Sequence, residues 1–301
     1  MTPRLRYILS GAIDGFTNMA VDEVLLGECE RGVIDGALRV YGWAPPAVSL
    51  GYAQSIDLVD PVRCRELGID LVKRITGGGA VLHWEEVTYC LVLRKEALPA
   101  LKWPRQFARL TGTALCEALR SLGVEASLSP AAEPRGANGV RSSRGSPVEG
   151  RATPNGIRSS GVARSSLCFS SGTENEVTVG GRKLAGCAHK FTREAFFSHG
   201  STMTGAAHIR IVEVVGERAS GMSASMLRER SVCLSDLLPS VPCLEIVGRE
   251  LKRGVETSFG LSLVEGRLSR HEEESAGALS LAKRQDREGA KGVVGQVRFS
   301  V

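Results

Sequence analysis

The sequence lacks the features that mark membrane, disulfide-bonded and metal-binding proteins. No apolar run approaches the length that a bilayer-spanning helix needs, and residues 1–16 have neither the apolar core nor the cleavage site of a signal peptide. The eight cysteines include no CxxC pair, which argues against a zinc site or a disulfide framework. No cluster of His, Cys and Asp has metal-ligand spacing. We therefore expect a cytoplasmic protein without a metal or other cofactor, in which most cysteines are small core residues.

Composition and charge narrow the class further. With 301 residues, 43% hydrophobic and 24% charged, the chain has the profile of a globular protein with one large domain or two small ones. Its net charge of +5 could indicate nucleic-acid binding. However, residues 131–166 contain six arginines and two glutamates, a net of +4, which leaves +1 for all other residues. Because the basicity belongs to one segment, we expect no nucleic-acid partner.

Residues 131–166 differ in kind from the rest of the chain. They contain no aromatic residue and no leucine, and they are rich in Gly, Ser, Pro and Arg, so they cannot bury enough apolar surface to offset the entropy of ordering. The motif NGVRSS at 138–143 recurs as NGIRSS at 155–160, a short duplication. We expect a disordered insertion. The alternative is an arginine-rich tether for an acidic protein partner.

Hydrophobic patterning predicts helices on both sides of this insertion. Residues 18–31 form an amphipathic pattern, with Thr17 or Asn18 as the expected cap. Asp22 and Glu23 would then lie in the first turn, which favours acidic residues. Further helices are expected at 61–67, opened by Asp60 and Pro61, at 104–122 and at 242–259.

Strands are predicted between these helices, at 37–43, 47–51, 87–93, 176–179, 182–185, 196–203 and 261–264. The run at 87–93 is apolar enough to be a central strand. A capping box of Ser269 and Glu272 begins a last, polar helix, and we expect the tail beyond Glu288 to fray.

Three consecutive glycines interrupt an extended pattern early in the chain. Gly77, Gly78 and Gly79 lack Cβ atoms, so their backbone N–H groups can line the wall of a cavity. Arg74 and His83 would flank that wall. An isolated triple glycine is more often a plain hairpin turn, and only its context gives it a functional meaning.

The glycine turn resembles the signature Arg-x-Thr-Gly-Gly-Gly-Ala-Val-x-His of the lipoate-protein ligase and octanoyltransferase superfamily, which shares its catalytic fold with biotin ligases. NMAVDE at 18–23 is similar to the family's opening helix, and WAPPAVSLGYAQ at 43–54 to its pattern Trp-x-x-Pro-x-x-Ser-Leu-Gly-x-x-Gln. In that family the turn, with its Arg and His, lines a tunnel for an eight-carbon acyl chain. The resemblance covers about residues 6–205 outside the insertion. It implies the biotin/lipoate protein ligase catalytic fold, an α/β (α+β) fold with mixed sheets packed with helices.

A second family signature follows the insertion. The pattern Gly-x-Lys-(apolar)-x-Gly-x-Ala is present as GRKLAGCA, with Lys183, Gly186 and Ala188, and the later His-Gly pair is His199 and Gly200. By resemblance the lysine reaches the acyl carbonyl, and the substrate contacts Gly186, Ala188 and His199. A cation at a partly buried site can polarise a carbonyl and favour the thiolate form of a nearby thiol.

Cys168 indicates which branch of the family is present. In cysteine-dependent octanoyltransferases a Cys-Phe pair precedes a Glu and then the lysine, and Cys168, Glu176 and Lys183 reproduce that order. A thiolate that attacks a thioester forms an acyl-enzyme of similar energy, so no nucleotide is required. The resemblance thus implies transfer of octanoyl from octanoyl-acyl carrier protein through Cys168 to the lysine of a lipoyl domain or the glycine-cleavage H protein. We expect a monomer with no membrane partner.

Some positions depart from the family pattern or have a simpler role. Gly172, Thr173 and Asn175 replace the usual Pro-Ser and aromatic residue, and Cys187-Ala188-His189 replaces Ser-Ala-Gln. We interpret Cys187 as a small wall residue rather than a rival nucleophile. For His189 and His199, a wall or hydrogen-bonding role is favoured over that of a base. Glu85 and Glu86 are expected to be solvated, and His208 and His271 to lie on the surface.

The expected organisation is a catalytic domain at 1–264, interrupted at 131–166, followed by a C-terminal helix and frayed tail at 265–301. Three other functions stay open at the level of sequence. An ATP-dependent lipoate ligase lacking its accessory domain would make Cys168 incidental. An amidotransferase would move octanoyl between lipoyl domains, and an acyl-binding scaffold would not use the cysteine at all.

Overall fold

The computed structural model describes residues 5–129, 167, 176–216 and 221–296, with residues 288–296 as backbone only. The expected insertion lies outside the described residues, and so do Cys168, Gly172, Thr173 and Asn175. The disorder and the domain boundaries expected there therefore stay predictions.

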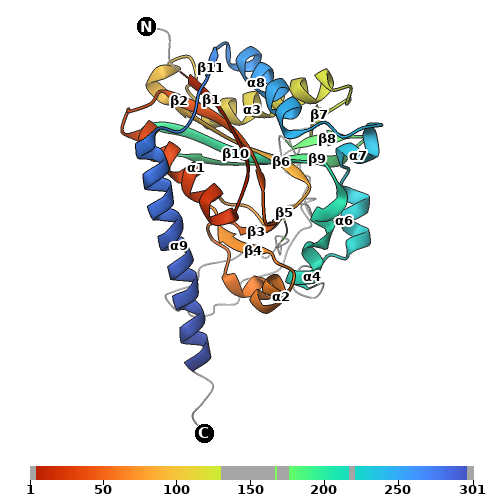
Figure 1. The fold of residues 1–301 in the computed structure, drawn as a ribbon. Coiled ribbons are helices and arrows are strands. Elements are labelled where there is room, and N and C mark those ends of the chain that lie inside the picture. Colours follow the sequence, from red (N-terminus) through yellow and green to blue (C-terminus); the bar gives the residue numbers. More distant parts are fainter. Residues whose placement is uncertain (1–4, 130–166, 168–175, 217–220, 297–301) are drawn as a thin grey trace, which may run out of the picture.

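The centre of the molecule is a main sheet with strand order β11-β1-β2-β6-β10-β9-β8-β7 (Figure 1). β1 is parallel to β2 and β11, and the other neighbouring pairs are antiparallel. The strands are β1 (Leu5–Ile13), β2 (Gly36–Trp43), β6 (Glu86–Arg94), β7 (Ser127–Leu128), β8 (Val177–Val179), β9 (Arg182–Phe191), β10 (Ala195–Met203) and β11 (Leu263–Glu265). The apolar strand β6 lies between β2 and β10, so its predicted central position is confirmed.

A small sheet of order β4-β3-β5 carries the glycine turn. Its strands are β3 (Ala47–Leu50), β4 (Asp70–Lys73) and β5 (Val81–His83). β3 is parallel to β4 and antiparallel to β5. The glycines connect β4 to β5 across β3, so the expected sequence of strand, turn and strand is confirmed although the turn closes no hairpin.

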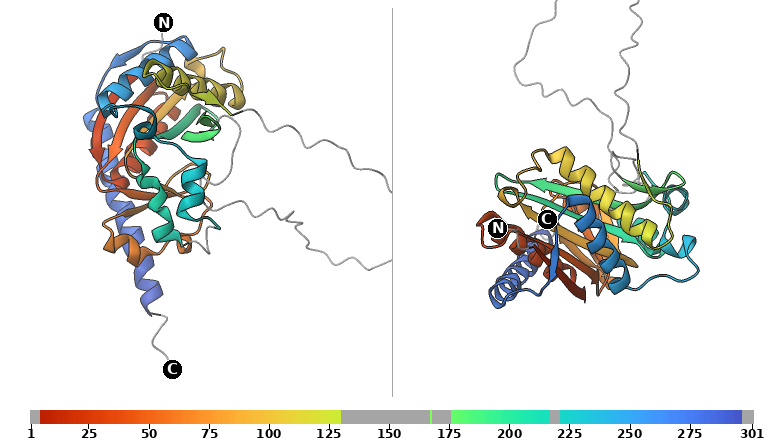
Figure 2. Two further views of the ribbon diagram at one scale, coloured as in Figure 1. Left: turned by 90° about the vertical axis from the view of Figure 1, so that its right-hand side faces the viewer. Right: turned by 90° about the horizontal axis from the view of Figure 1, so that it is seen from above.

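Helices cover both faces of the main sheet (Figures 1 and 2). The α-helices are α1 (Gly15–Glu30), α2 (Pro61–Glu66), α3 (Pro104–Ser121), α4 (Val212–Val215), α6 (Ala224–Arg230), α7 (Leu234–Leu237), α8 (Leu244–Phe259) and α9 (Arg270–Gln296). Short 3-10 helices are η1 (Ile56–Leu58), η2 (Lys95–Ala97) and η3 (Ala206–Ile211). α3 and α8 pack on the face that carries Leu38 and Leu91, whereas α1 and α9 pack on the face of Tyr41, Cys90 and Val92. This mixed α/β architecture is the fold class that the sequence predicts.

The start of α1 differs from its prediction. The helix begins at Gly15, and its cap is Asp14, whose carboxylate accepts a hydrogen bond of 3.0 Å from the Thr17 backbone N–H. Asn18 is therefore inside the helix, and Asp22 lies beyond the first turn. The apolar periodicity begins at the buried Phe16, and Asp14 is itself a good capping residue, which extends the helix by a turn.

The C-terminal elements follow the sequence closely. The capping box is present, since Ser269 N–H donates to Glu272 at 2.6 Å and Glu272 N–H donates to Ser269 Oγ at 3.2 Å. α9 is longer than expected, because its backbone stays helical to Gln296, past Glu288.

The structure also bears on the cysteines, on membrane-spanning helices and on groups of metal ligands. Cys29, Cys64, Cys90, Cys116 and Cys233 are buried, as predicted for small core residues, while Cys187 is half-buried and Cys243 exposed. Every helix in the described part of the chain is too short or too polar to cross a bilayer. No group of three or more potential metal ligands occurs among these residues.

Candidate active site

The packing around the glycine turn leaves no room for a side chain at Gly78 or at Gly51, which lies against it. A Cβ on Gly51 would lie 2.1 Å from the carbonyl oxygen of Gly78, and a Cβ on Gly78 would lie 2.8 Å from Nη2 of Arg74. Gly78 also has φ 99°, in the region that favours glycine. The turn is therefore pressed against the end of β3.

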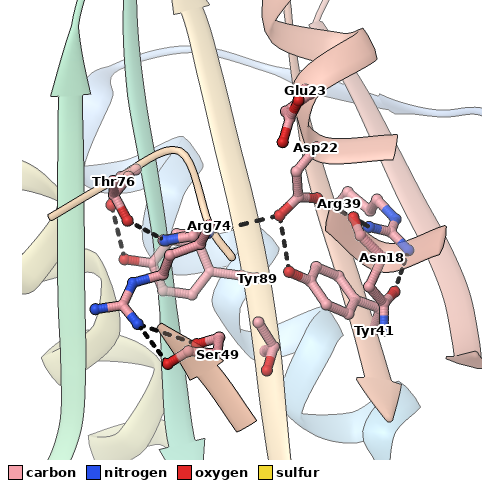
Figure 3. Close-up of polar contacts among 12 residues, drawn as sticks. Asn18, Asp22, Glu23, Arg39, Tyr41, Ser49, Arg74, Thr76 and Tyr89 are labelled. Carbon is pink, nitrogen blue, oxygen red and sulfur yellow. Dashed lines mark hydrogen bonds and ion pairs between the residues drawn. The ribbon is translucent and has the colours of Figure 1, made fainter. Parts of the chain in front are cut away.

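Arg74 holds the turn from the inside. Its buried guanidinium donates through Nη1 to the carbonyl and hydroxyl oxygens of Ser49, at 3.0 Å each, as Figure 3 shows. Through Nη2 it donates to the carbonyl oxygens of Gly77 and Gly79, at 2.8 Å each. These contacts fix the backbone of the turn, whereas the resemblance implies a lining role for the arginine.

His83 leaves the turn at the end of β5 and joins a buried polar cluster. Its Nε2 lies 2.7 Å from Ser49 Oγ, its Nδ1 lies 2.6 Å from Oε1 of Glu86, and its ring stacks on Trp43 with centroids 4.0 Å apart. Glu86 Oε1 also accepts hydrogen bonds of 2.6 Å from the hydroxyls of Thr88 and Ser201. His83 thus ties the small sheet to the main sheet.

Glu86 was expected to be solvated, and that prediction is wrong. Its side chain is buried, and Oε2 has no hydrogen-bond partner among the described residues. Burial alone would raise the pKa of this carboxyl, but His83 and the two hydroxyl donors lower it below the ordinary value. In the sequence, the position of Glu86 at the start of a central strand could have indicated that its side chain is buried. Its neighbour Glu85 is exposed, as expected.

His199 contacts the turn from the main sheet. Its Nε2 lies 2.6 Å from Oγ1 of Thr76, the residue before the glycines, and its Nδ1 faces Oδ2 of Asp22 at 3.6 Å. Burial lowers the pKa of His199, although Asp22 acts in the opposite direction. The helix motif at 18–23 thus supplies a carboxylate behind the site, a role that sequence reasoning missed.

Strands β9 and β10 form the second side of the site with small residues. Gly186 pairs with Ser201 and Ala188 pairs with His199, so these four residues point to the same face of the main sheet. A Cβ on Gly186 would lie 2.9 Å from Cε and 3.1 Å from Nζ of Lys183. The ammonium group therefore lies beside the same face.

Lys183 is buried and paired. Its Nζ donates to Oε1 of Glu176 at 2.5 Å. Its backbone forms a bridge with Ser231, whose hydroxyl lies 2.8 Å from Nε2 of His208. His208 is buried and burial lowers its pKa, so the prediction of a surface histidine is wrong, while His271 is exposed as predicted.

The remaining candidates lie on the opposite face. Cys187 pairs with Gly200 and packs against the core under α3 and α8, where it interacts with Tyr89. This position argues against a rival nucleophile, but it places Cys187 against the core and not on the wall formed by Gly186 and Ala188. His189 packs edge-on against Phe107, and burial, together with nearby His199, lowers its pKa to about 4. A base at His189 is not favoured, since it pairs with Ser198 on the face opposite to Gly186 and Ala188.

The structure also shows where the chain arrives before Cys168. Leu167 is buried and forms a parallel bridge with Ala80, the residue after the third glycine. The glycine turn is thus joined to the residue preceding Cys168 at one end and, through Thr76 and His199, to the face of β9 beside which Lys183 lies.

The architecture and site define a protein with the catalytic fold of lipoate ligases. A lipoate-protein ligase A solved with ATP superposes with a TM-score of 0.65 at 20% identity, over 92% of this chain and 94% of that chain. A bipartite lipoate protein ligase from Thermoplasma acidophilum gives 0.68 at 20% identity, over 92% of each chain. The family model of the lipoyl protein ligase A/B catalytic domain matches residues 14–255. The chain therefore belongs to this family, and the resemblance seen in the sequence is confirmed.

Curated relatives of similar length are octanoyltransferases. The octanoyltransferase LipM of Symbiobacterium thermophilum is 32% identical over 290 residues, which are 94% of this chain and 96% of the relative. The octanoyltransferase LipM of Moorella thermoacetica is 29% identical over 271 residues, 89% of this chain and 90% of the relative.

Proposed function

We propose that this protein is an acyltransferase that moves an octanoyl group from octanoyl-acyl carrier protein to a lysine of a lipoyl domain or the glycine-cleavage H protein. The observation that carries the proposal is that the glycine turn is joined both to Leu167, through Ala80, and to the strands beside Lys183, through Thr76 and His199. The names of the relatives favour octanoyl transfer over ATP-dependent ligation.

The reaction would run in two balanced steps. The Cys168 thiolate attacks the donor thioester, so that a new thioester forms and the carrier leaves as a thiol after taking up a proton. The ε-amine of the acceptor lysine then attacks the acyl-enzyme, an amide forms, Cys168 leaves as the thiolate, and the amine releases a proton. No nucleotide is consumed in either step.

Lys183 would orient and polarise the acyl carbonyl. Its ion pair with Glu176 fixes the ammonium group, which reduces the cost of positioning it at the moment of reaction. The same carboxylate offsets part of the lysine's charge, so Lys183 would favour the thiolate form of a nearby thiol less than an unpaired lysine does. Gly186, Ala188 and His199 would form one side of the acyl site and the glycine turn the other.

The experiment is intact-mass analysis after incubation with octanoyl-acyl carrier protein in the absence of ATP. We expect an octanoyl adduct on the wild type and on the matched control Cys187→Ser, and none on Cys168→Ser. Addition of a lipoyl domain should discharge the adduct. An adduct that persists in Cys168→Ser contradicts the proposal, and adduct-free protein that consumes ATP with lipoate indicates a ligase. An octanoyl group that moves only from one lipoyl domain to another indicates an amidotransferase.

A further inference from the structure

The carboxylate of Asp22 lies at the centre of a buried polar cluster behind the site (Figure 3). Oδ1 accepts from Nη1 of the fully buried Arg39 at 2.8 Å, and Oδ2 accepts from the Tyr41 hydroxyl at 2.8 Å. Oδ2 also faces Nδ1 of His199 at 3.6 Å. Arg39 has further partners in Asn18, through the side-chain oxygen at 2.6 Å, and in Ser10. Asp22 therefore links α1 to a residue that contacts the glycine turn.

The contacts of His199 favour one neutral tautomer. At 3.6 Å the Asp22 carboxylate is beyond hydrogen-bond distance but within reach of a strong charge–dipole interaction in a buried site. A hydrogen on Nδ1 points toward this negative charge, whereas a lone pair there would be repelled by it. With the hydrogen on Nδ1, Nε2 has a lone pair that accepts the Thr76 hydroxyl at 2.6 Å.

We infer that Asp22 is a positioning residue, which holds His199 as the Nδ1–H tautomer so that His199 in turn anchors Thr76 at the entry to the glycine turn. The inference deepens the proposed function and rests on it only where activity is measured. Arg74 fixes the interior of the glycine turn. The contacts from Asp22 through His199 to Thr76, here called the relay, fix the start of the turn against the main sheet. Loss of the relay moves the acyl wall, and small misplacements of a substrate wall cost rate.

The first test needs no substrate and no variant of Asp22. Nitrogen-15 NMR of histidine-labelled wild type, with the His199 signals assigned by loss in His199→Gln, should show neutral His199 with its hydrogen on Nδ1 at neutral pH. Thr76→Val removes the hydroxyl while keeping a branched side chain of similar shape, and His199 should stay in the Nδ1–H form. A hydrogen on Nε2, a protonated ring, or a change of tautomer in Thr76→Val overturns the inference.

The second test uses Asp22→Asn, with Tyr41→Phe as the matched control that removes another partner of the same carboxylate. We expect Asp22→Asn to lose the preference for Nδ1–H and to lower kcat/KM for the octanoyl donor about tenfold. Tyr41→Phe should keep both. Asp22→Asn also takes the counter-ion from buried Arg39, which can prevent folding. If Asp22→Asn does not fold, Thr76→Val provides the activity test. We expect this variant to lower kcat/KM for the octanoyl donor about tenfold as well. An unchanged kcat/KM would contradict the inference.

These readouts separate the inference from the proposed function. An Nδ1–H tautomer without acyl transfer supports the relay and contradicts the octanoyltransferase. Acyl transfer with an Nε2–H tautomer supports the octanoyltransferase and contradicts the relay.

Discussion

The two sides of the site are built in opposite ways. The turn side, consisting of Arg74, the three glycines and His83, is held by buried hydrogen bonds that span both sheets. The strand side, consisting of Gly186 and Ala188 on β9, is built from the smallest side chains. A Cβ on Gly186 would lie 3.1 Å from Nζ of Lys183.

This difference predicts different responses to substitution. A buried polar network that loses a member leaves other groups unsatisfied, so changes on the turn side should lower the free energy of unfolding. On the strand side, an added atom changes the space beside Lys183 while the strand pairing stays intact. Changes there should reduce activity more than stability.

The largest effect is expected for Arg74→Met. The carbonyl oxygens of Ser49, Gly77 and Gly79 lose their charged donor, which should cost roughly 3–5 kcal/mol in the free energy of unfolding. Urea unfolding should show a lower midpoint with an unchanged m value. Arg94→Met is the control, because this arginine is paired with the exposed Glu96 and should contribute under about 1 kcal/mol. Equal midpoints for the two variants would show that the guanidinium does not hold the turn.

Local features of the fold could be predicted from the sequence because their determinants are adjacent residues. Gly180 and Gly181 form the expected hairpin turn between β8 and β9, with φ values of 56° and 77°. Gly260 ends α8 in the left-handed conformation, as a helix-terminating glycine should. Strand order is set by distant segments, so the insertion of β3 between β4 and β5 could not be deduced.

The site shows the same division. The resemblance supplied Lys183, His83 and His199, and Glu176 lies only seven residues before Lys183, but other contacts come from distant parts of the chain. Glu86 accepts a hydrogen bond from Ser201, which is 115 residues away on the neighbouring strand. The local pattern around Asp22 indicated only a helix start, since its contact with His199 depends on tertiary packing.

A smaller effect is expected on the strand side, from Gly186→Ala. The new Cβ would lie 2.9 Å from Lys183 Cε, and a flexible side chain can move away at little cost in stability. The displaced ammonium group should lower the rate of acyl-enzyme formation about tenfold, measured by intact mass against time. Gly277→Ala, in exposed space on α9, makes the same chemical change and should leave that rate unaltered. A rate in Gly186→Ala equal to that of the control would mean that the position of Lys183 does not limit acylation.

The smallest effect should appear only in acid, and it returns to the turn side. His83 and two hydroxyls lower the pKa of Glu86 below its ordinary value of 4.5, so its contribution to stability is present above that pH and is lost as the pH falls through the folded-state pKa. Urea midpoints measured between about pH 7 and about pH 3 should therefore fall more steeply for the wild type than for Glu86→Gln.

Glu85→Gln removes a carboxylate from the adjacent, exposed position and should give a curve parallel to the wild type. If Glu85→Gln and Glu86→Gln flatten the acid limb equally, the buried His83–Glu86 pair is not what distinguishes the turn side. The contrast between the two sides would then rest on the hydrogen bonds of Arg74 and on the contact between Thr76 and His199.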